Sequence, residues 1–187
     1  MNGVPVPIET ERLRLRLVCP ADAAEMSRLM TPEISAFVSN WPLPFTRERA
    51  IRRIAEMVVA AITGRVMPLA IVRRADEAFL GYVSVRRNDT DPRLAGMGYW
   101  LGAEFHGQGY MREAILALVH HAFTVMDLSR IEAACLPENA ASRGVLEKCG
   151  FKYEGVAQSY MQIAGRWRNH VLYANLRNDR RGRTDVG

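Results

Sequence analysis

The stretch that decides the fold reads Gly102-Ala103-Glu104-Phe105-His106-Gly107-Gln108-Gly109-Tyr110-Met111-Arg112-Glu113-Ala114. It joins an apolar, aromatic run at 97–101 to an amphipathic run at 110–126, so we expect a strand, a glycine-rich loop and a helix. Gly107 and Gly109 allow the backbone to approach a ligand closely. A helix that begins there points unpaired N–H groups and the positive end of its dipole into the loop. The stretch therefore predicts an anion site, with a phosphate group as the expected ligand.

The same two glycines would also suit an ordinary strand-to-helix turn with no ligand, because short glycine patterns are weak signals. No Gly-Lys-Ser/Thr follows them, which argues against a P-loop, and the third glycine of a dinucleotide fingerprint is missing. A second motif, at 139–151, favours the ligand-binding interpretation.

Length and composition predict one domain over residues 1–187, with a core at about 9–176 and a basic C-terminal tail. Hydrophobic residues make up 49% of the chain and charged residues 24%, as is usual for a soluble globular protein. The chain has no long uncharged apolar run and no signal-peptide pattern, so we expect a cytoplasmic protein that does not bind membranes. Its three widely spaced cysteines favour reduced thiols over a disulfide framework or a metal site.

The net charge of +5 comes from arginine, and part of the excess lies in the tail at 177–183. A basic tail can bind nucleic acid or an acidic protein surface, but a solvated terminus is the simpler interpretation. No basic face with interleaved aromatic residues indicates a dedicated nucleic-acid-binding protein.

The periodicity of the sequence predicts an α+β fold, in which helices flank a mixed, mostly antiparallel sheet. After an irregular lead-in at 1–8, we expect strands at 12–18, 69–72, 79–85, 94–101, 130–136, 152–163 and 167–176. Helices are expected at 22–30, 46–63, 110–126 and 140–149, with a further turn or two at 32–38. The expected apolar face of the helix at 46–63 consists of Ile51, Ile54, Met57, Val58 and Ile62, and that of the helix at 110–126 of Met111, Ala114, Ile115, Leu118, Val119, Ala122, Val125 and Met126. The alternation of helices and strands requires at least one parallel crossover.

The second motif reads Asn139-Ala140-Ala141-Ser142-Arg143-Gly144-Val145-Leu146-Glu147-Lys148-Cys149-Gly150-Phe151. Together with Gly98-Tyr99-Trp100-Leu101 and the loop at 106–111, it resembles the GNAT acyltransferase superfamily. The branch that it resembles most is the Rim type, the ribosomal-protein N-terminal acetyltransferases. The segments at 9–13 and 41–42 fit this branch as well, and the resemblance covers about residues 9–176.

The resemblance implies a GNAT-like fold that binds acetyl-CoA, without a metal, between two splayed strands. The pyrophosphate would lie on the amides of 107–112, and the pantetheine arm would pair with backbone near Trp100 and Leu101. The residues implied to bind the cofactor are Trp100, Leu101, His106, Gly107, Gln108, Gly109, Tyr110, Met111, Arg112, Asn139 and Ser142. The chain departs from the family pattern at His106 and Met111, where Gln or Arg and Gly or Ala are usual. It also has Leu146 where many relatives carry a tyrosine that acts as an acid.

The implied reaction is attack of a neutral amine on a thioester, which needs an oriented site, an oxyanion donor and a route for protons. Ser142 and Asn139 are the expected catalytic residues of the second motif, and Ser142 would assist the leaving thiolate. Without the resemblance, Ser142 would be an ordinary first-turn serine. Glu104 is the first candidate for a base, although a solvated loop carboxylate explains it equally well.

Glu154, His106 and His170 are further candidates for the base, whereas His120 and His121 fall on a helix and are expected to be surface or satisfied residues. Trp41, Tyr99 and Tyr160 would line a groove for the substrate, although aromatic residues more often belong to a core.

Three functions stay open at this point. The first, which the motifs favour, is transfer of acetyl from acetyl-CoA to the N-terminal α-amino group of a ribosomal or other protein. The second is acetylation of a small amine such as an antibiotic or a polyamine. The third is a non-catalytic acyl-CoA-binding module. The sequence does not distinguish a monomer from a homodimer.

Overall fold

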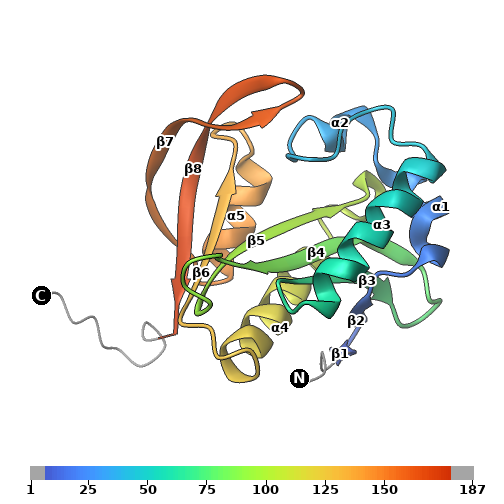
Figure 1. Ribbon diagram of the computed structural model, residues 1–187, viewed down its shortest axis with the longest axis horizontal. Coiled ribbons are helices and arrows are strands. Elements are labelled where there is room, and N and C mark those ends of the chain that lie inside the picture. Colours follow the sequence, from blue (N-terminus) through green and yellow to red (C-terminus); the bar gives the residue numbers. More distant parts are fainter. Residues whose placement is uncertain (1–6, 178–187) are drawn as a thin grey trace, which may run out of the picture.

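A single sheet of eight strands organises residues 7–177, the part of the chain that the computed structural model describes (Figure 1). Its spatial order is β1-β2-β3-β4-β5-β6-β8-β7. The strands are β1 (Ile8–Glu9), β2 (Leu13–Leu17), β3 (Val66–Arg73), β4 (Phe79–Arg87), β5 (Leu94–Leu101), β6 (Arg130–Cys135), β7 (Lys152–Ile163) and β8 (Arg166–Leu176). The helices are α1 (Ala23–Leu29), α2 (Pro32–Ser35), α3 (Arg47–Ile62), α4 (Tyr110–Thr124) and α5 (Ala140–Lys148). Short 3₁₀ turns occupy Pro20–Asp22 and Ala103–Phe105.

The sheet is antiparallel except at its centre, where β5 and β6 run parallel. Helix α4 provides the crossover between these two strands, because a parallel connection cannot be made by a tight turn. The predicted fold class, a mostly antiparallel sheet with a parallel crossover and flanking helices, is therefore confirmed.

Strands β5 and β6 pair along only part of their length. Their parallel register joins Leu94–Met97 to Arg130–Ala133, while β5 continues to Leu101 and β6 to Cys135. Beyond Met97, β5 pairs with β4 alone, and β6 pairs with β8. The two strands thus separate toward their carboxyl ends, and the gap between them forms a wedge in the middle of the sheet.

Two hydrophobic cores lie on the two faces of the sheet. The first packs α4 and part of α5 against residues such as Leu15, Leu69 and Val83. The second packs α1 and α3 against a different set of strand residues, which includes Trp100. Successive strand residues point to opposite faces, so Trp100 belongs to the α1–α3 face and Tyr99 to the α4–α5 face.

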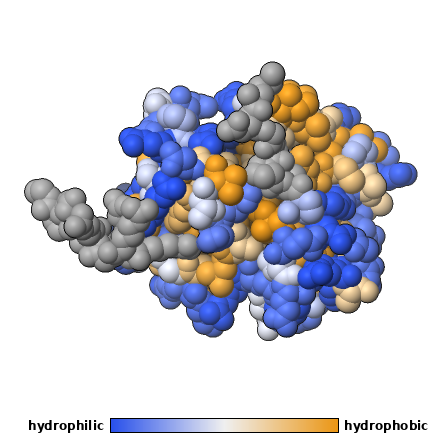
Figure 2. All heavy atoms as spheres, turned by 90° about the horizontal axis from the view of Figure 1, so that it is seen from below, coloured by the Kyte–Doolittle hydropathy of each residue, from blue (hydrophilic) through white to orange (hydrophobic). Residues whose placement is uncertain are grey.

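Helix α3 buries a different stripe from the one that we expected. Its buried residues are Ala50, Ile54, Met57 and Ala61. The prediction that Ile51 and Ile62 lie in the core is wrong, because Ile51 is 43% exposed and Ile62 is 80% exposed. The two alanines lie in line with Ile54 and Met57 and let the helix approach the sheet closely, which leaves Ile51 and Ile62 at the exposed margins of the buried stripe. On the face seen from below, hydrophobic surface gathers on one side, next to a larger polar area (Figure 2).

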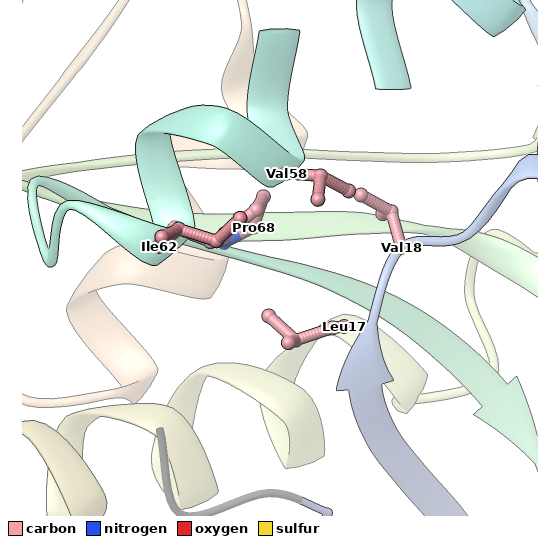
Figure 3. Close-up of a pocket in the computed structure, with 6 residues that line it drawn as sticks. Leu17, Val18, Val58, Ile62 and Pro68 are labelled. Carbon is pink, nitrogen blue, oxygen red and sulfur yellow. The ribbon is translucent and has the colours of Figure 1, made fainter. Parts of the chain in front are cut away.

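An apolar hollow of about 90 Å³ lies between α3 and the strands beneath it. In Figure 3, Val58 and Ile62 from α3 point toward Pro68 of β3 and toward Leu17 and Val18 at the end of β2. The wedge lies elsewhere, between β5 and β6, so this hollow is separate from it.

Other expectations differ from the structure only locally. Part of the expected irregular lead-in pairs as β1, whose two residues were too few to give a pattern, and residues 1–6 lie outside the described chain. The turn expected at 32–38 is helical only over Pro32–Ser35. Val125, expected on the buried face of the central helix, lies after the last residue of α4 and is 55% exposed. Of the basic tail, Arg177 is described, and it pairs with Asp127 at 2.5 Å.

The three cysteines are free thiols, and Cys135 and Cys149 are buried, as expected. Within residues 7–177, no cluster of three or more His, Cys, Asp or Glu side chains could hold a metal ion. No helix in this range is long and apolar enough to cross a membrane.

Candidate active site

The glycine-rich loop connects β5 to α4 at the open end of the wedge. Gly107 and Gly109 have φ values of +75° and +81°, which side chains rarely adopt. Gly109 occupies the N-cap position of α4 in the left-handed conformation, and no side chain caps the helix. A Cβ at Gly107 would meet no heavy atom within 4 Å, so backbone conformation is what favours glycine there.

The amides of this loop are left unused by the part of the chain that the structure describes. Glu113 is the first residue of α4 whose amide bonds back along the helix, to the Gly109 carbonyl at 3.1 Å. Within residues 7–177, no hydrogen bond uses the amides from Gly107 to Arg112. The first amides of any helix lack intrahelical acceptors, and here the N-cap residue cannot supply one. This uncapped start of α4 is therefore suited to an anion.

Three hydrogen bonds from side chains to backbone carbonyls hold the loop in place. The His106 ring donates from Nε2 to the Leu101 carbonyl at 3.1 Å, and Gln108 Nε2 donates to the Glu104 carbonyl at 3.0 Å. Arg12, just before β2, donates to the Gln108 carbonyl at 3.0 Å. The side chains of His106 and Gln108 thus bond to the loop's own backbone, while the loop amides stay available.

Glu113, in the first turn of α4, anchors the helix to the N-terminal segment. Its carboxylate accepts from Thr10 Oγ1 at 2.6 Å, from the Arg12 amide at 2.9 Å and from Arg12 Nε at 2.7 Å. Burial acts to raise the pKa of Glu113, but the hydrogen bonds from Thr10 and Arg12 outweigh burial and lower it. The sequence motifs assign no role to this network, because its members lie about a hundred residues apart.

Strand β5 directs backbone groups into the wedge. In an antiparallel pair, only alternate residues bond to the neighbouring strand. Gly102 donates to the Leu80 carbonyl and Asn88 to the Leu94 carbonyl, so the even-numbered residues of β5 bond to β4. Tyr99 and Leu101 therefore point their backbone groups toward β6, which no longer pairs with them.

Trp100 lies differently from its neighbours in β5. Its backbone faces β4, and its ring packs 5.3 Å from Trp41 in the core of the α1–α3 face. Trp41 is only 6% exposed, so it would support the residues of a substrate groove rather than contact the substrate itself. The roles expected for both tryptophans stay predictions.

Helix α5 begins on the other side of the wedge, just after β6. The Asn139 Oδ1 accepts from the Ser142 amide at 3.0 Å, which caps the helix. The Ser142 Oγ lies 2.7 Å from the hydroxyl of Tyr99. The structure thus brings Tyr99, Asn139 and Ser142 together, and the Tyr99–Ser142 contact joins β5 to α5 across the wedge.

Burial affects the proton-bearing groups beside Ser142. It raises the pKa of Tyr99, so the phenol keeps its proton at neutral pH. Burial likewise raises the pKa of Cys135, at the end of β6. A hydrogen bond from Ser142 opposes this effect but is outweighed by burial. Both groups are therefore neutral hydrogen-bonding groups at pH 7 rather than nucleophiles or bases.

The carboxylates proposed as bases are paired with arginines. Glu104 lies 2.9 Å from Arg28 of α1, and both side chains are about half exposed. Glu154 lies 2.5 Å from Arg130, and the hydrogen bond from Arg130 lowers the pKa of Glu154. The Glu154 carboxylate is therefore a weak proton acceptor.

The candidate histidine and the aromatic residue on the β7–β8 hairpin lie close together. His170 is 3% exposed, and its Nδ1 lies 3.0 Å from the Arg168 carbonyl. The ring of Tyr160, which is 44% exposed, lies 5.7 Å from the ring of His170. The end of this hairpin and α2 both lie at the upper end of the molecule in Figure 1. The groove role of Tyr160 and the role of His170 as a base stay predictions.

Comparison with known proteins agrees with this geometry. Residues 12–152 match the family described as Acetyltransferase (GNAT) domain. The Bacillus subtilis protein named probable N-acetyltransferase YjcK is 34% identical over 136 residues, which are 72% of this chain and 75% of that protein.

Solved structures share this fold. The ribosomal-protein-S5-alanine acetyltransferase of Vibrio fischeri has a TM-score of 0.82 and 27% identity, covering 94% of this chain and 98% of that one. Mycobacterium smegmatis RimJ, solved in complex with CoA-disulfide, has a TM-score of 0.81 and 29% identity, covering 89% of this chain and 83% of that one. The match over residues 12–152, together with the wedge and its uncapped helix, shows that the chain belongs to the GNAT acetyltransferase family and is an N-acetyltransferase.

Proposed function

We propose that this chain transfers the acetyl group of acetyl-CoA to the α-amino group of a protein or peptide. The observation that carries the proposal is the uncapped start of α4, which follows β5 at the open end of the wedge and leaves its first amides unused within residues 7–177. Hydrogen bonds to a charged group contribute about 1.5–3 kcal/mol each, so several amides could hold a pyrophosphate without a lysine. The complex of Mycobacterium smegmatis RimJ with CoA-disulfide supports a CoA ligand in this fold.

The residues around the wedge fit the rest of such a ligand. The amides and carbonyls of an extended pantetheine arm can pair with the Tyr99 and Leu101 backbone groups that point toward β6. His106 already occupies the Leu101 carbonyl, so the Tyr99 carbonyl and the two amides are the groups left for pairing. One of those amides could also donate to the carbonyl oxygen on which negative charge develops. The thioester supplies an activated acetyl group. We infer that the Ser142 hydroxyl donates to its sulfur, because Ser142 begins α5 beside the wedge and its hydroxyl lies 2.7 Å from that of Tyr99 on β5.

The choice of an α-amino acceptor follows from the protonation of amines. A lysine side chain with a pKa of about 10.4 is neutral in only about one part in a few thousand at pH 7, whereas an α-amino group near 7.7–8.0 is about a tenth neutral. The carboxylates proposed as bases are both paired with arginines. A site whose candidate carboxylates are engaged by arginines acts best on an amine that has already lost much of its proton.

The chemistry of related proteins supports a protein acceptor. The Vibrio fischeri structure is named for acetylation of an alanine of ribosomal protein S5. Exposed aromatic residues on the β7–β8 hairpin, Tyr160 and Trp167, are 44% and 62% exposed and would suit an extended peptide. We therefore propose a ribosomal or other protein N-terminus as the acceptor.

A competition experiment tests this proposal. A peptide with a free N-terminus and an internal lysine is incubated with acetyl-CoA and the protein, and the acetylated positions are mapped by mass spectrometry. A second peptide with a blocked N-terminus and polyamines serve as alternative acceptors. We expect modification of the α-amino group. Predominant acetylation of lysine would show that a strong base operates, and rapid acetylation of the polyamine alone would identify a small-amine enzyme.

A further inference from the structure

Two hydroxyl groups meet at the edge of the wedge, and they come from different elements. Tyr99 belongs to β5 and Ser142 to the first turn of α5, and their oxygens lie 2.7 Å apart. The backbone of Ser142 is fixed independently, because its amide donates to Asn139 Oδ1. The position of the Ser142 hydroxyl is therefore defined from two sides.

The direction of the bond between the hydroxyls decides what Ser142 can do. Each hydroxyl carries one hydrogen, so only one of the two can donate in this bond. If Tyr99 donates to Ser142 Oγ, the hydrogen of Ser142 is left for another acceptor, either the neighbouring Cys135 thiol or the sulfur of a bound thioester. If Ser142 donates to Tyr99, it has no hydrogen left for a substrate. A phenol is a stronger acid than an alkyl alcohol and is the better donor, and burial keeps the Tyr99 phenol protonated.

Because this inference rests on the proposed function, it concerns the same acetyl transfer. We propose that Tyr99 is a positioning residue that donates its hydrogen bond to Ser142 and thereby directs the Ser142 hydroxyl toward the sulfur that leaves the acetyl group. Tyr99 acts through Ser142 and touches neither the sulfur nor the amine. This role differs from the groove wall that we expected for Tyr99 from the sequence.

The reaction balances without a proton being removed from either hydroxyl. A bond forms between the amine nitrogen and the acetyl carbon, the carbon–sulfur bond breaks, and its electron pair leaves on sulfur. The Ser142 O–H donates a hydrogen bond to that developing thiolate, and the Tyr99 O–H strengthens the donor by polarising it. The amine gives up one proton, and the thiolate takes up one proton from solvent. Hydrogen bonding suffices because an alkyl hydroxyl is a weaker acid than a thiol.

The test combines Tyr99→Phe, Ser142→Ala and the double variant. Release of CoA thiol gives kcat and KM for each, and calorimetry gives the affinity for acetyl-CoA. We expect Tyr99→Phe to lower kcat about tenfold, the size of one hydrogen bond, with acetyl-CoA affinity within about twofold of wild type. Ser142→Ala should lower kcat at least as much, and the double variant should be no slower than Ser142→Ala, because Tyr99 acts through Ser142.

Tyr173→Phe is the matched control. Tyr173 is a buried tyrosine of the same sheet, and its hydroxyl donates to Glu147 of α5 at 2.8 Å. It should lower the thermal midpoint while kcat stays unchanged. Ser142→Thr, which keeps a hydroxyl, should retain more activity than Ser142→Ala and should stay sensitive to Tyr99→Phe.

The outcomes separate this inference from the proposed function. A wild-type protein that binds acetyl-CoA but releases no thiol with any amine overturns both. An active wild type with an unchanged kcat in folded Tyr99→Phe overturns the positioning role alone. Rate reductions that multiply in the double variant would also overturn it, because they would show that Tyr99 acts independently of Ser142.

Discussion

The two helices that follow the splayed strands begin in opposite ways. Helix α4 begins at Gly109, which has no side chain to cap it and leaves the amides from Gly107 to Arg112 unused within residues 7–177. Helix α5 begins at Asn139, whose side chain accepts from the Ser142 amide. Because β5 and β6 are parallel, both starts lie at the same edge of the sheet. One helix start thus stays available for an anion, whereas the other uses its own cap to fix a hydroxyl.

Helix α3 shows what an ordinary start looks like in this chain. Its N-cap Thr46 accepts from the Arg49 amide at 3.3 Å. Such a cap stabilises a helix by about 0.5–2 kcal/mol, and α4 lacks one. A bound phosphate would restore the missing stabilisation. We propose on this basis that the start of α4 holds the pyrophosphate and that the start of α5 serves departure of the thiolate.

The largest expected effect is a loss of acetyl-CoA affinity when the start of α4 is altered. Gly109→Val forces a β-branched residue into a φ near +81°, at a position where an added Cβ would lie 3.4 Å from the end of the Arg12 side chain. The loop must shift, and each hydrogen bond from an amide to a phosphate contributes about 1.5–3 kcal/mol to binding. We expect calorimetry to show acetyl-CoA affinity reduced at least about tenfold in a folded protein.

Gly64→Val is the control for this variant. Gly64 also has a positive φ, +70°, but lies between α3 and β3 with nothing within 4 Å of an added Cβ. It should lower stability and leave acetyl-CoA affinity unchanged. Equal reductions of affinity in the two variants would mean that Gly109 matters only for folding.

A smaller effect is expected on stability and kcat when the cap of α5 is removed. Asn139→Ala removes the cap and should lower the free energy of unfolding by about 1 kcal/mol, since it leaves the Ser142 amide unpaired. It should also lower kcat about three- to tenfold, because Ser142 loses one of its two restraints. Thr46→Ala removes the cap of α3, and we expect a similar loss of stability in urea unfolding with no change in kcat. Matching kcat values in the two variants would contradict a special role for the α5 start.

The smallest effect concerns the anchor of α4. The hydrogen bonds from Thr10 and Arg12 lower the pKa of Glu113 against the effect of burial. A carboxylate with a lowered folded-state pKa stabilises the protein above its unfolded pKa of about 4.3, and this contribution is lost as the pH falls through the folded value. Glu113→Gln should therefore be less stable than wild type by about 1 kcal/mol at pH 7, and the difference should shrink on acidification below about pH 4.3. A difference in chemical unfolding that does not vary with pH would assign the effect to packing instead.

Local pattern was enough to predict most of this fold. The strand at 94–101 and the helix that begins at Tyr110 are predicted with their observed starts, because the apolar, aromatic run of the strand and the helical spacing after it are clear. The exposure of Ile51 and Ile62 could not be predicted in this way, since it depends on how Ala50 and Ala61 seat α3 on the sheet. Hydrophobic spacing identifies an apolar stripe but does not show which edge of it is covered.

The candidate site was predictable in its parts but not in its contacts. Gly107, Gly109 and Asn139 were identified from their motifs, and the structure places them at the two helix starts. The bond between Tyr99 and Ser142 joins residues 43 positions apart, and the hydrogen bonds of Glu113 reach back more than 100 positions. Such pairings depend on the crossover between β5 and β6, so spacing in the sequence alone did not reveal them.

The most direct test of the division between the two helix starts compares two acetyl donors. S-acetylpantetheine carries the thioester but lacks the pyrophosphate, so its use depends on the α5 side of the wedge and not on the start of α4. The measurement is the ratio of kcat/KM for acetyl-CoA to kcat/KM for S-acetylpantetheine in wild type, Gly109→Val and Ser142→Ala. We predict that Gly109→Val lowers this ratio at least about tenfold, whereas Ser142→Ala slows both donors alike and leaves it unchanged. An unchanged ratio in a folded, active Gly109→Val protein would contradict the account, because the start of α4 would then not be the pyrophosphate site.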